Sequence, residues 1–338
     1  MILIDAIYIN NSGGLVLLQY LIKELEKSKL DIFYLLDDRT EQLFSNLNES
    51  RCKFMSSSFY KRLVFYTKNK RKFTSVLCFG NIPPPIKLDV SVSVYFHQPL
   101  FLSIPPSFSL RNKIIYRLKQ EILGYYKKNT SLWIVQSNLI KFRLAKKYLS
   151  EDDSKVKVIP FYPPLNFIKN DIHIRRDKNF LYVSNSALHK NHDLLLDAFC
   201  DAYDINRKGL LTVTIPTSSY MLCDKIKQKI ADGYPIVNVG FVDRKELIEL
   251  YLSHQYLIFP SLAESFGLGL VEAIDGGCKV IVSDLPYAYQ VCKPSLTFNP
   301  NIKESIKNAI IKATEKDLPE SEKIISNDIN QLISLLSD

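Results

Sequence analysis

The sequence predicts an α/β protein built on doubly wound parallel sheets. Short apolar runs alternate with helical stretches along the chain, which is the pattern of consecutive strand–helix–strand units. The run at residues 2–9 is almost continuously apolar, as expected for a strand that a parallel sheet buries on both faces. The length of 338 residues favours about two domains.

A proline-rich stretch at residues 158–164 marks the predicted domain boundary. Its sequence is Val-Ile-Pro-Phe-Tyr-Pro-Pro, and three prolines in so short a segment end a strand and stiffen a connector. We therefore expect an N-terminal domain over residues 1–163, a second domain over residues 164–319 and a C-terminal helix over residues 320–338.

In the first domain, a strand at residues 2–9 leads through Gly13 and Gly14 into a helix. These glycines either approach a ligand or simply form a tight turn. His97 follows a strand that ends at Phe96, at the edge where open α/β sheets bind ligands; the alternative is a histidine that caps a loop. Further strands are expected at 31–36, 76–79, 90–96, 132–135 and 156–160, with helices at 58–70, 108–128 and 138–149.

The second domain restarts with a strand at 180–183, and residues 184–192 lead into the next helix. The remaining strands are expected at 211–215, 236–239, 280–283 and 296–298, with another that ends at Phe259. Helices are expected at 221–231, 244–252, 302–314 and 320–336, and from about Gly267.

Residues 259–284 carry the strongest functional signal. Four of the 11 glycines of the chain fall inside this stretch, and Gly267 and Gly269 open its helix. The first N–H groups of a helix and its positive dipole end form an anion site. Glu264 and Glu272 flank this helix start. Two carboxylates beside an anion site need neutral donors, and a nucleotide sugar offers both phosphates and hydroxyls.

The segment Glu264–Glu272, E-S-F-G-L-G-L-V-E, resembles the E-x7-E signature of the retaining glycosyltransferase family 4. The next residues resemble that family's continuation, with Lys279 where the family has proline. Lys190 and Asn191 match the end of its G-R-x-x-x-x-K-N pattern, whereas Ser184 and Asn185 replace the Gly-Arg pair. An ordinary strand–helix–strand unit with solvated acids is the alternative interpretation.

The resemblance implies two Rossmann-like domains that face a cleft, the GT-B fold, with a final helix that crosses back to the first domain. It implies catalytic roles for Glu264 and His97. Glu264 would accept from hydroxyls of the transferred sugar, Glu272 from the ribose, and Lys190 would contact the diphosphate. The donor-binding residues that we expect are Lys190, Asn185, Ser265, Phe266, Gly267, Leu268, Glu272, Gly13 and Gly14.

The function that the resemblance implies is sugar transfer, with retention, from a nucleoside-diphosphate sugar to an acceptor hydroxyl. We expect bacterial surface-polysaccharide assembly of the O-antigen or capsule type, and a saccharide acceptor that is lipid-linked. No metal and no cofactor besides the donor substrate are expected, since no D-x-D stands in a sugar-nucleotide context. A sugar-nucleotide epimerase and a non-catalytic partner subunit are the alternatives. A dehydrogenase would need G-x-G-x-x-G after the first strand.

Charge is unevenly distributed along the chain. Residues 1–165 hold 25 Lys and Arg against 13 Asp and Glu, whereas the remaining residues hold 19 against 22. Basic and aromatic residues occur together at 59–72 and 111–128. This mixture favours an anionic membrane surface as partner over a merely solvated helix face. We expect no nucleic-acid partner, because no recognition motif accompanies the charge.

The six cysteines are scattered without a C-x-x-C pair, as in a protein of a reducing compartment. No basic region precedes the first strand, and no apolar run reaches the roughly 18 residues of a membrane span. We therefore expect a cytoplasmic protein, or one that is peripheral on the inner face of the cytoplasmic membrane.

Overall fold

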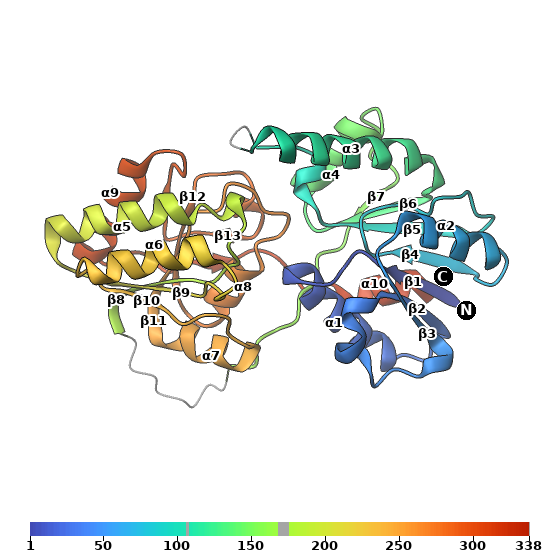
Figure 1. Ribbon diagram of the computed structural model, residues 1–338, viewed down its shortest axis with the longest axis horizontal. Coiled ribbons are helices and arrows are strands. Elements are labelled where there is room, and N and C mark those ends of the chain that lie inside the picture. The colour runs from blue at the N-terminus through green and yellow to red at the C-terminus, as the bar shows by residue number, and fades with distance from the viewer. Residues whose placement is uncertain (106–107, 168–175, 338) are drawn as a thin grey trace. The chain divides into compact units, whose positions relative to one another are not determined.

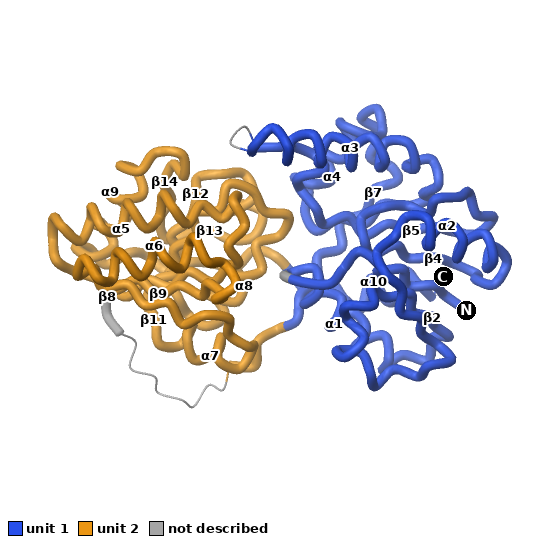
Figure 2. The backbone as a smooth tube through the Cα atoms, in the orientation of Figure 1, with its two compact units in different colours: residues 1–163, 326–338 blue, residues 164–325 orange. Residues whose placement is uncertain are grey.

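The computed structural model describes residues 1–105, 108–167 and 176–337. The chain forms two compact units (Figure 2): unit 1 contains Met1–Pro163 and Ser326–Asp338, and unit 2 contains Pro164–Ile325. Each unit is an α/β layer structure with a parallel sheet (Figure 1). The predicted fold class is therefore confirmed.

Unit 1 has a seven-stranded parallel sheet with the strand order β3-β2-β1-β4-β5-β6-β7. The order reverses between β1 and β4, which is the point where doubly wound sheets open a ligand crevice. Every residue of β1 and β2 is buried, which explains why all of their residues except Asp5 and Asp37 are apolar. The strands are β1 Ile2–Ala6, β2 Ile32–Asp37, β3 Cys52–Met55, β4 Ser75–Cys78, β5 Ser91–Phe96, β6 Leu132–Val135 and β7 Val156–Val158.

Five α-helices of the described residues belong to unit 1. Ser58, Ser109 and Ser137 begin three of them, and in each case the serine hydroxyl accepts a hydrogen bond from a backbone N–H of the first turn. The helices are α1 Ser12–Glu26, α2 Phe59–Lys68, α3 Leu110–Tyr126, α4 Asn138–Tyr148 and α10 Ile329–Ser337.

Unit 2 has a six-stranded parallel sheet with the order β10-β9-β8-β11-β12-β14. Here the order reverses between β8 and β11, which pair in parallel. Two short segments, β13 Cys292–Lys293 and β15 Glu322–Lys323, form an antiparallel pair. The strands of the larger sheet are β8 Arg176–Tyr182, β9 Leu210–Val213, β10 Ile236–Asn238, β11 His254–Phe259, β12 Lys279–Ser283 and β14 Leu296–Phe298.

The helices of unit 2 begin and end with recognisable signals. Asp243 and Glu246 form a reciprocal capping box at the start of α7. Gly267 precedes α8 with a φ of +83°, which suits glycine best. The helices are α5 His192–Asn206, α6 Tyr220–Ala231, α7 Arg244–Ser253, α8 Leu268–Asp275 and α9 Lys303–Glu315.

Three local expectations need correction. The edge strand β3 was not predicted, because only four residues of mixed burial form it. The last helix begins at Ile329 and not near residue 320. The segment before it is tied to the edge of the sheet, where the Ser321 hydroxyl oxygen accepts from the N–H of Val280 at 2.8 Å.

The third correction concerns Arg62, which lies in the basic stretch 59–72 but does not contribute to a charged surface. Its side chain is 1% exposed, and Nε donates to Asp5 Oδ2 at 2.8 Å. The other guanidinium nitrogens donate to the carbonyl oxygens of Pro83 and Ile82. A buried cation needs such complete pairing. Arg62 therefore holds α2 against β1 and the loop after β4.

None of the helices in the described part of the chain combines the length and the apolarity that a membrane span requires.

Candidate functional site

The candidate site lies where the strand order of unit 2 reverses. Strands β8 and β11 are neighbours in the sheet, and the loop after each leads to a helix start, α5 and α8 respectively. Carboxyl ends of parallel strands at such a reversal are the usual ligand site of open α/β sheets. Lys190 comes from the loop after β8, and Glu264 comes from the loop after β11.

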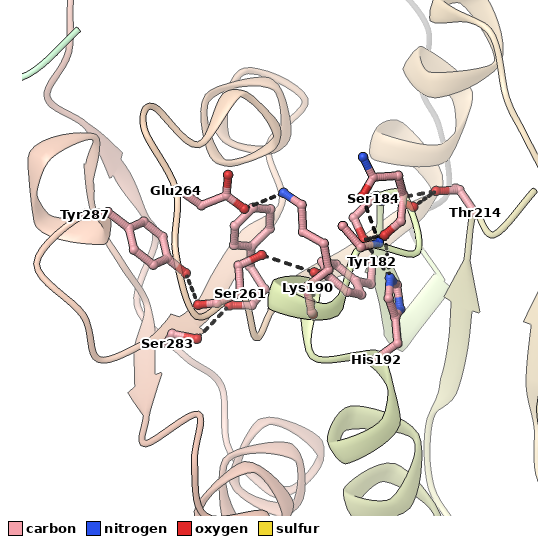
Figure 3. A network of polar contacts seen from close by, with 12 residues as sticks. Tyr182, Ser184, Lys190, His192, Thr214, Ser261, Glu264, Ser283 and Tyr287 are labelled. Atoms are coloured by element: carbon pink, nitrogen blue, oxygen red, sulfur yellow. Dashed lines mark hydrogen bonds and ion pairs between the residues drawn. The ribbon is translucent and has the colours of Figure 1, made fainter. Parts of the chain in front are cut away.

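Lys190 and Glu264 form an ion pair (Figure 3). Lys190 Nζ donates to Glu264 Oε1 at 2.5 Å, and the two side chains are only 14% and 13% exposed. Lys190 Nζ also lies 5.7 Å from the centroid of the Phe259 ring. The structure therefore brings together the predicted phosphate-binding cation and a predicted catalytic carboxylate.

The loop that carries Lys190 is fixed by its neighbours. The Tyr182 hydroxyl donates to the Lys190 carbonyl oxygen at 2.8 Å. Asn191 adopts a left-handed backbone with φ of 60°, and its amide donates to the carbonyl oxygens of Pro260 and Pro300 at 3.3 and 2.8 Å. Asn tolerates this conformation better than most residues. Asn191 thus joins three loops at the carboxyl edge of the sheet.

His192 supports the same loop, although no sequence motif distinguishes it as a site residue. Its Nε2 lies 2.9 Å from the Asn185 carbonyl oxygen and 2.8 Å from Ser184 Oγ. Burial lowers the pKa of His192 to about 4, so the ring is neutral at pH 7. Asn185 Oδ1 accepts from the N–H of Ala187 at 3.1 Å. The side chain of Asn185 therefore helps to form the turn, and its predicted contact with the donor stays a prediction.

The loop between β11 and α8 carries Glu264, Ser265, Phe266 and Gly267. Phe266 is buried, and Ser265 is half-buried. The positive φ of Gly267 favours glycine, and a Cβ atom there would lie 3.0 Å from Leu270 Cδ1, so that the leucine side chain would have to shift. The first N–H groups of α8, beginning near Leu268, have no carbonyl four residues earlier in the helix. An anion that approached this end would meet those groups.

Three hydroxyl groups hold the base of this loop (Figure 3). Tyr287 donates to the Ser261 carbonyl oxygen at 2.9 Å, and Ser283 donates to the Phe259 carbonyl oxygen at 3.3 Å. The Tyr182 hydroxyl lies 3.2 Å from Ser261 Oγ. These bonds connect the loops after β8, β11 and β12. They therefore restrict the movement of the two loops that carry Lys190 and Glu264.

Glu272 belongs to a second group of side chains on α7 and α8. It is 5% exposed, and Arg244 Nη1 donates to its Oε1 at 2.9 Å. The Tyr251 hydroxyl donates to Oε2 at 3.3 Å. Burial raises the pKa of Glu272, whereas Arg244 and Tyr251 act in the opposite direction. Sequence reasoning missed Arg244, which lies 28 residues from its partner and is identified only by the packing of α7 on α8.

The predicted site residues of unit 1 lie at the reversal point of its own sheet. His97 follows β5, and Gly14 lies in the first turn of α1, the helix after β1; a Cβ atom at Gly14 would lie 3.1 Å from His97 Cε1. His97 Nε2 lies 3.0 Å from the Phe79 carbonyl oxygen, and the backbone N–H of His97 donates to Asn81 Oδ1 at 2.7 Å. Burial lowers the pKa of His97 to about 4.

At Gly13, by contrast, a Cβ atom would have no neighbour within 4 Å. The structure therefore brings Gly14 and His97 together, and a side chain at Gly13 would meet open space.

No three His, Cys, Asp or Glu side chains are arranged to hold a metal ion in the part of the chain that the structure describes. Within unit 2, the Lys190–Glu264 ion pair lies beside the loop that neutral His192 supports, and Glu272 lies in a second group on α8 with Arg244 and Tyr251. A lysine and helix N–H groups bind phosphate, and carboxylates accept from hydroxyl groups.

Residues 166–331 match the family described as glycosyl transferases, group 1. The chain is 27% identical over 244 residues to the O-antigen chain mannosyltransferase RfbU of Salmonella typhimurium, an alignment that covers 70% of this chain and 64% of that protein. It aligns with 28% and 34% of two further curated relatives. The chain thus spans less than two thirds of these relatives.

Solved structures share the fold. Anabaena Alr3699/HepE, solved with UDP and glucose, superimposes with a TM-score of 0.67 at 14% identity, covering 93% of this chain and 89% of that one. The lipopolysaccharide outer core galactosyltransferase WaaB gives a TM-score of 0.63 at 13% identity, with coverages of 99% and 94%. The chain thus has the GT-B fold of two parallel-sheet units, and its residues 166–331 are similar to the glycosyl transferases of group 1.

Proposed function

We propose that this protein transfers a sugar, with retention, from a nucleoside-diphosphate sugar to a hydroxyl group of a saccharide acceptor. The observation that carries the proposal is the Lys190–Glu264 pair at the reversal point of the unit 2 sheet. A largely buried cation that is held by a single carboxylate can exchange that partner for a phosphate. The carboxylate then becomes available to sugar hydroxyls.

In the proposed reaction, the bond between the anomeric carbon and the phosphate oxygen breaks, and a bond to the acceptor oxygen forms on the same face. Lys190 and the first N–H groups of α8 stabilise the charge that develops on the leaving diphosphate. The leaving phosphate takes the acceptor proton, so the step needs no metal and no cofactor. Glu272 accepts from ribose hydroxyls, and Glu264 accepts from the transferred sugar and positions it. His97 is assigned the catalytic role, and Gly13 and Gly14 the donor contacts, that the resemblance implies.

The relatives support the choice of donor and pathway. HepE was solved with UDP and glucose, and RfbU is named as an O-antigen chain mannosyltransferase. We therefore assign the protein to bacterial surface-polysaccharide assembly, with a lipid-linked saccharide as acceptor at the cytoplasmic face of the membrane. No nucleic acid takes part.

A panel of UDP, GDP, ADP and CMP sugars tests this proposal. We expect the sugar nucleotides of one base to raise the melting temperature of the protein more than those of the other bases. With that donor and extracted lipid-linked saccharides, mass spectrometry should find one added sugar only when the acceptor is present. Isomerised donor without an acceptor would identify an epimerase instead. Absence of any stabilising sugar nucleotide would contradict the proposal.

A further inference from the structure

Helix α3 carries a row of exposed apolar side chains along one face. Leu110, Ile114, Leu118, Ile122 and Tyr125 recur at steps of four and three residues, which places them on one side of a helix. Leu110, Leu118 and Tyr125 are 72%, 59% and 64% exposed. We call these five residues the α3 stripe. A continuous row of exposed apolar side chains usually marks an interaction surface, whereas single exposed apolar residues need no explanation.

The opposite face of α3 is the one that packs on unit 1. Leu123 is fully buried, and the Tyr116 ring contacts those of Phe101 and Phe108. Gln120 donates to the Leu100 carbonyl oxygen at 3.1 Å. Helix α3 is therefore held on unit 1 by the face that carries Tyr116, Gln120 and Leu123 (α3 is at the top of unit 1 in Figure 1), and the α3 stripe is not needed for this packing.

Positive charge surrounds the α3 stripe. Residues 110–128 contain six Lys and Arg and one acidic residue, Glu121. At the C-terminal end of the stripe, Tyr125 and Tyr126 line a pocket together with Lys87 and Lys128, and Lys128 Nζ lies 4.7 Å from the Tyr125 ring centroid. The Phe59 ring of α2 packs on Tyr126 at 5.5 Å, and its neighbour Tyr60 is 72% exposed.

We propose that the α3 stripe docks on an anionic lipid bilayer, with its aliphatic side chains at the level of the upper acyl chains. Aliphatic residues along the centre, tyrosines at the end and cations at the edges are the distribution of interfacial helices. Long basic side chains reach lipid phosphates while their stems remain on apolar surface. A second copy of this chain fits poorly, because symmetric pairing would oppose the two sets of cations.

The proposal deepens the proposed function, because a membrane surface would present the lipid-linked acceptor. Its test does not depend on sugar transfer. Vesicles of phosphatidylglycerol and phosphatidylcholine, or of phosphatidylcholine alone, are sedimented with the full-length protein. We expect binding to the anionic vesicles, little binding to the neutral ones, and no displacement by inorganic phosphate at matched ionic strength.

Two double variants test the surface itself. Ile114→Asp with Leu118→Asp should weaken vesicle binding by more than about tenfold, because two apolar side chains no longer enter the bilayer. Tyr220→Asp with Met221→Asp is the matched control, since these residues of α6 are 75% and 91% exposed. The control should bind like the wild type. Calorimetry with the nucleoside diphosphate should give equal affinities for all three proteins.

A charge-reversal pair gives an independent readout if the aspartate variant fails to fold. Lys113→Glu with Arg117→Glu should reduce binding by at least about 25-fold, as expected for two cations at a membrane surface. Lys227→Glu with Lys312→Glu is its control on unit 2. Unchanged vesicle binding of both α3 variants, or no binding of the wild type, would overturn the proposal. Light scattering that shows a dimer broken by the aspartate pair would overturn it as well.

Discussion

Glu272 is the buried carboxylate of the E-x7-E segment, and its environment sets how it can act. Arg244 and Tyr251 donate to its two oxygens, and these hydrogen bonds oppose the burial that raises the pKa of Glu272. A carboxylate that is held in place in this way has further lone pairs that can accept hydrogen bonds, as the proposed contact with ribose hydroxyls requires. Removing the whole side chain would leave Tyr251 and Arg244 without this partner, so a shape-conserving change is the better probe.

Glu272→Gln should weaken binding of the donor by about tenfold, because a charge-assisted hydrogen bond is replaced by a neutral one. Calorimetry with the sugar nucleotide measures this loss. Glu315→Gln, an exposed residue at the end of α9, should leave the affinity unchanged. Identical affinities of the Glu272→Gln protein and the wild type would remove Glu272 from the ribose site.

His192 gives the protein a predictable response to acid. Its pKa is about 4 in the folded protein and near 6.5 in an unfolded chain. Between these values the unfolded chain binds more protons, so the free energy of unfolding should fall as the pH drops from about 6.5 to 4. Above pH 6.5 the contribution is fully present.

The full pKa shift of His192 corresponds to on the order of 3 kcal/mol in the free energy of unfolding. His192→Gln retains a donor near the Asn185 carbonyl oxygen but does not titrate. Its melting temperature should therefore change less than that of the wild type over this pH range. Parallel curves for the two proteins would show that His192 does not carry the effect.

At the scale of elements, the start of α8 depends on Gly267. Its φ of +83° and the short approach to Leu270 both oppose a side chain. Gly267→Ala should cost about 1–2 kcal/mol from the left-handed backbone alone, and the displaced helix start should lower the affinity for the nucleoside diphosphate. Thermal melting and calorimetry measure the two effects.

Gly233 offers a matched control for this change. It has a φ of +91°, but a Cβ atom there would have no neighbour within 4 Å. Gly233→Ala should lower the melting temperature and leave nucleotide affinity unchanged. If Gly267→Ala and Gly233→Ala behave alike in the binding experiment, the start of α8 takes no part in holding the diphosphate.

The helices and strands differ in how well the sequence could predict them. The long apolar strands and the helix that begins after Gly267 follow local patterns, so these elements lie close to their expected ranges. Strand β3 has only four residues, and none of them is fully buried. The segment before α10 forms a short β pair instead of a helix turn because Ser321 and its neighbours bond to the edge of the sheet. Such pairing depends on distant residues.

The residues discussed above also fall into those that the sequence could predict and those that it could not. Lys190, Glu264 and Glu272 could be selected from motif spacing. His192, Arg244 and the buried state of Arg62 could not, because each depends on contacts between segments far apart or on the local path of the chain. Arg62 and Asp5, for example, are 57 residues apart. A basic residue in a basic stretch gives no local sign that it is buried.

At the scale of the whole molecule, the chain leaves unit 1 at Pro163 and returns to it at Ser326. The returning segment is fixed by hydrogen bonds: the N–H of Asp328 donates to the Pro160 carbonyl oxygen at 2.8 Å, and the N–H of Tyr162 donates to Asn327 Oδ1 at 3.3 Å. Leu332 of α10 is fully buried. The stability of unit 1 therefore depends on the last residues of the chain.

Leu332→Ala should destabilise unit 1 by about 2–5 kcal/mol, as deletion of a buried leucine side chain usually does. Scanning calorimetry should show that unit 1 unfolds at a lower temperature than in the wild type. The unfolding temperature of unit 2, identified as the transition that the nucleoside diphosphate shifts upward, should not change. Ile324→Ala, at a side chain that is 58% exposed, should change neither transition. A shift of the nucleotide-sensitive transition alone would contradict this assignment.

The central proposal is that Lys190 exchanges Glu264 for the donor diphosphate. Calorimetric titration of the nucleoside diphosphate into the wild type, Lys190→Ala and Glu264→Gln tests it most directly. We expect Lys190→Ala to lower the affinity by about tenfold or more, because a charge-assisted contact is lost. Glu264→Gln should bind at least as tightly as the wild type, since Lys190 is released from its partner. Equal affinities of the wild type and Lys190→Ala would contradict the proposal.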